Sequence, residues 1–206
     1  MEALSFYIKV IQALEAIDAP YMIVGAFAGL AFGVSRATFD VDILVDLHES
    51  DFEALAAYFP PPRYYADPEM MRSSTQMGIM YNLIDTEAGV KADLVPVKRD
   101  AATRAAFDRR IRQTLLDEAG KSFSVWVAQP TDIIIGKLKA WKEGRSAKHP
   151  GDIQAMVIFA LSGLSDVTLD MQAIDTAAAR LGEDTAALWR SLCQRAEDQI
   201  QQHKNV

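Results

Sequence analysis

Two aspartates stand two residues apart in a stretch that otherwise has the pattern of a buried strand. In "SRATFDVDILV" (Ser35–Val45), Asp40 and Asp42 fall on one side of the chain, while Val41 and Ile43 fall on the other. Aspartate is depleted in strands, and like charges on one strand face repel each other. A hard divalent cation beside the two carboxylates relieves this repulsion, and Mg²⁺ prefers one or two protein carboxylates together with water and substrate phosphates. The pattern therefore predicts a magnesium site for a phosphate-bearing substrate.

A third carboxylate, that of Asp93, interrupts another apolar strand pattern. In "VKADLV", Lys91, Asp93 and Val95 share one side, whereas Ala92 and Leu94 share the other. Asp93 is thus a polar residue in an apolar strand, as Asp42 is, and it is available as a third ligand.

The segment "VGAFAG" is a candidate for the phosphate side of such a site. The apolar run Tyr21–Val24 ends at Gly25, and a helix rich in small residues is expected to follow. Backbone N–H groups and the positive end of a helix dipole both favour anions. Glycine also ends many strands that bind nothing, so this segment alone is a weak signal.

Lys137 lies in an unusual place for a lysine. If residues 131–142 form a helix, Ile133, Ile134, Leu138 and Trp141 make its apolar stripe, and Lys137 lies inside that stripe. A lysine there must either extend its ammonium group to solvent or find an anion.

Together these segments resemble the nucleotidyltransferase superfamily, to which polymerase beta belongs. The pattern of that superfamily is a strand ending in Gly-Gly or Gly-Ser, a helix, an Asp-x-Asp strand and a third Asp on a neighbouring strand, and "VGAFAGLAFGVSRATFDVDILVD" with "KADLVPV" matches it. The Arg-x-Thr-x-Asp-x-Asp spacing, the hairpin "NLIDTEAGVKADL" and "PTDIIIGKLKAW" with "GDI" are similar to a bacterial branch related to the nucleotidyltransferase toxins of abortive-infection systems. The resemblance covers about Tyr21–Phe159.

The resemblance implies roles for individual residues. Asp40 and Asp42 would hold Mg²⁺ (or Mn²⁺) on a nucleoside triphosphate, and Asp93 would complete a second metal site or activate the acceptor. The remaining implied contacts to the nucleotide are the turn Gly25-Ala26 at the β- and γ-phosphates, Lys137 at the triphosphate or pyrophosphate, and Asp152 as a site aspartate. Ala26 departs from the usual Gly or Ser, which removes a hydroxyl contact to phosphate.

Two of these residues keep a second interpretation. Arg36 binds phosphate in one interpretation and neutralises the two neighbouring aspartates in the other. Asp152 follows "HPG" in the first turn of an expected helix, where an acidic side chain is favoured by the helix dipole without any role in a site.

The implied reaction is attack by an acceptor on the α-phosphorus of the triphosphate, with pyrophosphate leaving. The acceptor is RNA or tRNA, a protein or a small molecule. A basic neighbourhood that includes Arg109 and Arg110 is the candidate path for RNA, and a cognate antitoxin protein is a further expected partner. The alternative is a catalytically weak or inactive module of the same fold that binds a nucleotide or a partner.

Periodicity along the chain predicts an α/β (α+β) protein: a nucleotidyltransferase-fold mixed sheet flanked by helices over residues 1–128, with a helical C-terminal region over 129–206. The expected strands and hairpin arms are 21–25, 35–45, 78–85, 89–97, 109–117 and 122–128; the expected helices are 2–17, 26–33, 50–59, 100–107, 131–144, 151–161, 170–182 and 184–203.

Composition limits the class of protein. The 206 residues carry a formal net charge of -7, which argues against a basic surface for non-specific duplex binding. A single cysteine, Cys193, allows no internal disulfide and fits a reducing compartment. No signal-peptide pattern and no membrane-length apolar run are present, so a cytoplasmic protein is expected.

Overall fold

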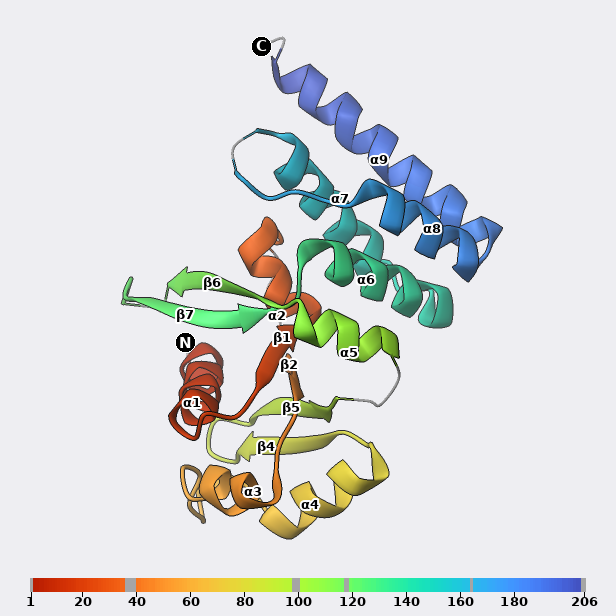
Figure 1. Ribbon diagram of the computed structural model, residues 1–206. Helices are drawn as coiled ribbons and strands as arrows, with labels where there is room; N and C mark the ends of the chain where they lie inside the picture. The colour runs from red at the N-terminus through yellow and green to blue at the C-terminus, as the bar shows by residue number, and fades with distance from the viewer. Residues whose placement is uncertain (1, 36–39, 98–100, 117–118, 164, 205–206) are drawn as a thin grey trace. The chain divides into compact units, whose positions relative to one another are not determined.

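The structure is a computed structural model that describes residues 2–35, 40–97, 101–116, 119–163 and 165–204 (Figure 1). The chain divides into two compact units. The first contains residues 1–27 and 37–128, and the second contains residues 28–36 and 129–206. The short helix α2 (Gly25–Gly29) crosses the division.

The first unit is built on one seven-stranded sheet. Its strands are β1 (Tyr21–Val24), β2 (Asp40–Val45), β3 (Tyr64–Tyr65), β4 (Tyr81–Asp85), β5 (Val90–Pro96), β6 (Ile111–Leu116) and β7 (Ser122–Val127). Its helices are α1 (Glu2–Ala16), α3 (Glu49–Ala56), α4 (Pro68–Met77) and α5 (Ala101–Asp108). The strand order is β3-β4-β5-β2-β1-β7-β6, in which β2 and β5 are parallel, β1 and β7 are parallel, and the other neighbours are antiparallel.

The register separates the sheet into an apolar face and a polar face. Val41, Ile43 and Val45 are buried, and they alternate with the half-buried Asp40 and Asp42 along β2. Burying a side chain of this size contributes roughly 1.5–3 kcal/mol, so a shift of one residue in register would be strongly unfavourable. The aspartates are therefore fixed on the polar face by the packing of their neighbours.

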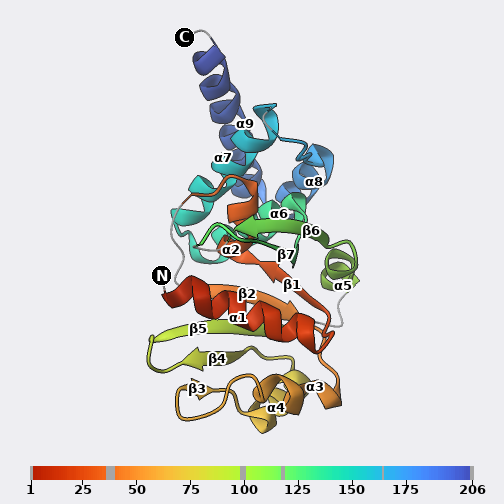
Figure 2. The same cartoon turned by 90° about the vertical axis from the view of Figure 1, so that its left-hand side faces the viewer.

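Helix α1 covers the apolar face, across β2 and β5 in Figure 2. The Tyr21 side chain lies on the same face as Val45, its partner in register, and its hydroxyl donates a hydrogen bond to Glu15 of α1 at 2.5 Å. Because α1 covers this face, it leaves the aspartates on the opposite side of the sheet.

Helix α4 is an element that sequence periodicity did not predict. Asp67 caps its N-terminus by accepting hydrogen bonds from the backbone N–H groups of Glu69 and Met70, Pro68 occupies its first position, and Gly78 ends it. These are standard signals for the two ends of a helix. The helix was missed because its residues, "PEMMRSSTQM", are mostly polar, so few apolar side chains mark its buried face.

The second unit is helical. It contains η1 (Leu30–Phe32), α6 (Pro130–Gly144), α7 (Lys148–Leu161), α8 (Met171–Leu181) and α9 (Glu183–Lys204). Gly33 has φ of +89°, and a Cβ atom there would lie 2.6 Å from Cβ of Phe159, so glycine is required where η1 packs against α7. Trp189 of α9 is buried and donates a hydrogen bond to Asp175 of α8 at 2.6 Å.

The predicted fold class is confirmed: a mixed sheet is flanked by helices, and helices fill the chain after residue 129. The predicted hairpin of β4 and β5 and that of β6 and β7 are both present. Within the described part of the chain, no helix is both long enough and apolar enough to cross a membrane.

Candidate active site

Two carboxylates lie side by side on the polar face of the sheet. Asp42 of β2 and Asp93 of β5 are partners in the parallel register, and Val24 and Asn82 continue the same row on β1 and β4. Asp40 lies two residues before Asp42 on the same face. Neighbouring strands are about 4.8 Å apart, so the structure brings the three predicted aspartates into one small area. Sequence alone could not show that their two strands are neighbours.

Gly25 gives the Asp42 carboxylate its space. The φ angle of Gly25 is +68°, and a Cβ atom added there would lie 2.3 Å from Oδ2 of Asp42. No side chain can therefore occupy this position unless Asp42 moves. The helix that follows is only five residues long, so its dipole is small, and the main contribution of Gly25 is room for the Asp42 carboxylate.

Asp93 is held by two hydrogen-bond donors that were not predicted as site residues. Lys91 places its ammonium nitrogen 2.7 Å from Oδ1 and 2.8 Å from Oδ2 of Asp93, and Asn82 donates to Oδ1 at 2.5 Å. The Asp93 side chain is 8% exposed, whereas the Lys91 side chain is 47% exposed. The carboxylate is therefore fixed in place by a buried environment, and its cationic partner reaches solvent.

The negative charge of this face affects the buried helix beneath the sheet. Tyr7 of α1 is almost fully buried, and its hydroxyl makes no hydrogen bond within the described residues. Burial raises the pKa of Tyr7 to about 12, with further contributions from the charges of Asp40 and Asp93. Tyr7 is therefore a neutral phenol at physiological pH, and both carboxylates act on it from the site.

The donor set fits a hard divalent cation. Asp40 and Asp42 supply carboxylate oxygens from successive positions of one face, and Gly25 leaves room for the Asp42 carboxylate. Across the described ranges, no group of three acidic, histidine or cysteine side chains is gathered closely enough to hold a metal ion. Mg²⁺ commonly uses only one or two protein carboxylates and completes its shell with water and substrate phosphates. A site of this kind is completed by its substrate.

Lys137 and Asp152 form a buried ion pair in the second unit. Nζ of Lys137 on α6 lies 2.6 Å from Oδ2 of Asp152 on α7, and the two side chains are 6% and 3% exposed. The expected anion for Lys137 is thus present in the chain itself. The interpretation of these two residues as nucleotide contacts stays a prediction.

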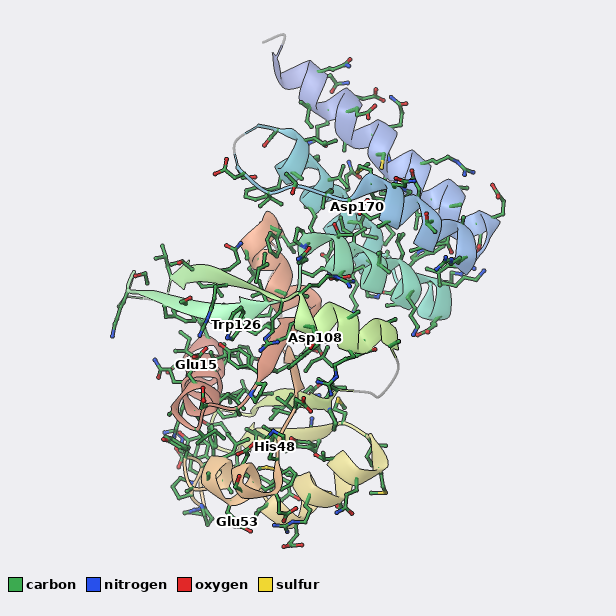
Figure 3. All side chains as sticks on the ribbon, in the orientation of Figure 1. Glu15, His48, Glu53, Asp108, Trp126 and Asp170 are labelled. Atoms are coloured by element: carbon green, nitrogen blue, oxygen red, sulfur yellow. The ribbon has the colours of Figure 1, made fainter. Side chains whose placement is uncertain are left out.

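The basic neighbourhood is largely occupied by contacts within the first unit. The Arg110 guanidinium stacks over Phe107 and Trp126, and Nη1 of Arg110 donates to the Phe107 carbonyl at 2.9 Å. Arg112 also stacks over Trp126, and it donates hydrogen bonds to both carboxylate oxygens of Glu15. Figure 3 labels Glu15 on α1 and Trp126 on β7. Arg112 therefore links β6 to α1, and Arg110 braces α5 against β7 of the sheet.

Arg36 and Ala26 are the two remaining predicted site residues. Arg36 lies outside the described residues, so its two interpretations stay open. Ala26 is half-buried in α2, next to Gly25.

Comparison with known proteins gives the fold. No family model and no curated protein match the chain. Among solved structures, it is similar to an antigenic nucleotidyltransferase-like protein from Paracoccidioides brasiliensis, with 17% identity, 93% of this chain and 92% of that chain covered, and a TM-score of 0.50. This likeness extends over nearly the whole length of both chains.

Lower similarity is found to ANT(2")-Ia in complex with adenylyl-2"-tobramycin, with 16% identity, 95% and 99% of the two chains covered, and a TM-score of 0.46. JHP933 from Helicobacter pylori is similar at 14% identity, with 99% and 96% covered and a TM-score of 0.45.

Proposed function

We propose that this chain, which has a nucleotidyltransferase-like fold, is a nucleotidyltransferase that transfers a nucleoside monophosphate from a nucleoside triphosphate to an acceptor. The observation that carries the proposal is the pairing of Asp42 with Asp93 on neighbouring parallel strands, with Asp40 on the same face. Asp40 and Asp42 form an acidic pair on one strand face, which favours a bound divalent cation. A nucleotide with its divalent cation supplies both the positive charge and the phosphates.

The residues divide the work according to their surroundings. Asp40 and Asp42 would hold Mg²⁺ or Mn²⁺, which supplies charge neutralisation at the triphosphate when bound. Gly25, which has no side chain, lets the Asp42 carboxylate lie against the strand end, where the phosphates would bind. Asp93, which is fixed by its hydrogen bonds, would accept the proton of an acceptor hydroxyl. Attack on the α-phosphorus then releases pyrophosphate.

The charge of the chain bears on the class of acceptor. The net charge of -7 and the internal contacts of Arg110 and Arg112 give little support to a broad RNA-binding surface. We therefore favour a small-molecule or protein acceptor over RNA. A toxin role with a cognate antitoxin stays a prediction from the sequence resemblance.

A second candidate is a nucleotide-binding module without turnover. The observation that favours it is the occupation of both oxygens of Asp93 by Lys91, which leaves that carboxylate less available for proton transfer. The two candidates differ in one measurable product, because only the transferase releases pyrophosphate.

The test is release of pyrophosphate and transfer of α-phosphate label from each nucleoside triphosphate in the presence of Mg²⁺. Cellular RNA, a protein extract and a small-molecule extract serve as separate acceptor pools. The wild type should transfer label, and Asp42→Asn should not. Asp46→Asn is the matched control, because it makes the same change just beyond β2. Asp46 pairs there with Arg104, outside the carboxylate row formed by Asp40, Asp42 and Asp93. Equal transfer by wild type and Asp42→Asn would reject the proposed site.

A further inference from the structure

Lys91 occupies both carboxylate oxygens of Asp93, next to the two aspartates that would hold the metal. Its ammonium nitrogen lies within 2.8 Å of both carboxylate oxygens of Asp93. In the register of β2 and β5, Lys91 is also the partner of Asp40, so its backbone lies next to Asp40 on one strand and two residues before Asp93 on the other. A lysine and a divalent cation are thus both drawn to the same negative charge.

The two members of the Lys91–Asp93 pair differ in their freedom to move. Asp93 is 8% exposed and also accepts a hydrogen bond from Asn82, whereas the Lys91 side chain is 47% exposed. An ion pair with one partly exposed long side chain is weak, because solvent competes for the ammonium group and the pair orders a flexible stem. If the contact breaks, Lys91 is the partner that moves and Asp93 is the one that stays.

We infer that Lys91 is a built-in competitor of the divalent cation: its ammonium group neutralises Asp93 in the absence of metal and leaves Asp93 when the metal binds. The inference rests on the proposed function, because it takes the carboxylate row as the metal site. It assigns to Lys91 a role that the other lysines of the chain do not share: setting the metal concentration at which the site fills. The effect has a definite sign, since removing the ammonium group should make metal binding tighter.

The test measures binding of Mn²⁺ alone, from the decrease of the electron paramagnetic resonance signal of free Mn²⁺. Lys91→Met keeps most of the stem and removes the charge. We expect its apparent dissociation constant to be about five- to tenfold lower than that of the wild type, as expected for removing one positive charge a few ångströms from a dication in a partly solvated site.

Two controls separate this effect from general electrostatics. Lys121→Met makes the same change of net charge at an exposed position before β7 and should shift the dissociation constant by less than about twofold. Combining Lys91→Met with Asp93→Asn should give no gain over Asp93→Asn alone, because the lysine would then have no carboxylate to compete for.

The outcomes are distinct. Tighter binding in Lys91→Met only, dependent on Asp93, supports the inference. Binding by the wild type that is lost in Asp42→Asn but unchanged or weakened in Lys91→Met overturns the inference and leaves the proposed metal site intact. Absence of Mn²⁺ binding in wild type, Lys91→Met and Lys121→Met overturns the metal site and the inference with it.

Discussion

The buried ion pair between Lys137 and Asp152 should be critical for the stability of the second unit. The two side chains are 6% and 3% exposed, and their charged atoms are 2.6 Å apart. Replacing Lys137 by Met removes the cation and leaves a carboxylate that has lost its main compensating charge inside the protein. Breaking a buried pair in this way costs about 3–5 kcal/mol, far more than loss of the attraction between exposed charges.

Urea unfolding followed by circular dichroism and tryptophan fluorescence measures the effect. Trp141 and Trp189 report on the second unit. With a slope of roughly 2 kcal/mol per M urea, Lys137→Met should lower the midpoint by on the order of 2 M. Replacing Lys137 by Met and Asp152 by Leu together should recover a large part of the loss, because no unpaired charge remains.

Lys142→Met is the matched control. Lys142 also bridges two helices, through Asp184 at 2.8 Å, but the two side chains are 37% and 41% exposed. Solvent can replace the lost partner there, so the unfolding midpoint should hardly change. If Lys137→Met were as stable as Lys142→Met, burial would not be what makes the first pair important, and the reasoning would be wrong.

Three other changes test the first unit. Gly25→Ala should weaken binding of a metal nucleotide by at least tenfold, because its Cβ atom would collide with Asp42. The control is Gly89→Ala, at a similar φ of +65°, where an added Cβ atom would meet nothing within 4 Å. It should cost only about 1–2 kcal/mol of stability and leave nucleotide binding, measured by titration, unchanged. Asp85→Asn should reduce the loss of stability in acid. Burial opposes ionisation of Asp85, but hydrogen bonds from Arg63 and two backbone N–H groups outweigh burial and lower the pKa of Asp85, so its contribution to stability is complete above about pH 4 and is lost as the pH falls through the lower folded-state pKa. Equal midpoints of acid unfolding for wild type and variant would refute this. Arg110→Ala should lower the free energy of unfolding by about 1–2 kcal/mol, because the stacking of Arg110 and its hydrogen bond are lost. Calorimetry measures the effect, with Arg109→Ala at an exposed position as the control. An unchanged melting temperature would show that Arg110 does not brace the sheet.

Sequence patterns predicted the fold well because the apolar and polar faces of the strands are cleanly separated. The alternation in β2 places Asp40 and Asp42 on one face in the sequence and in the structure. Helix α4 shows where apolar patterning gives little signal, since its residues are mostly polar and its end signals at Asp67, Pro68 and Gly78 identify it better.

Part of the candidate site was within reach of the sequence. Lys91 shares the face of Asp93 by simple alternation, and the predicted turn at residues 86–89 pairs Asp85 with Val90, which places Asn82 opposite Asp93. Both residues could therefore have been identified as partners of Asp93.

Other contacts could not be predicted from local patterns. The pairing of Asp42 with Asp93 depends on β2 and β5 being neighbours, although β3 and β4 lie between them in the chain. Arg112 contacts Glu15, which is 97 positions away, and thereby turns a supposed RNA-binding arginine into part of the protein's own packing. Such long-range partners are set by tertiary structure, about which a local charge pattern carries no information.

The most direct measurement for the central claim is calorimetric binding of a nucleoside triphosphate analogue that cannot be cleaved between its α- and β-phosphates, with and without Mg²⁺. We expect the wild type and Asp46→Asn to bind it only with Mg²⁺, and Asp42→Asn, with an unchanged fold, to lose this binding. Equal binding by wild type and Asp42→Asn, or no magnesium-dependent binding by the wild type, would contradict the assignment of Asp40, Asp42 and Asp93 as a nucleotide site.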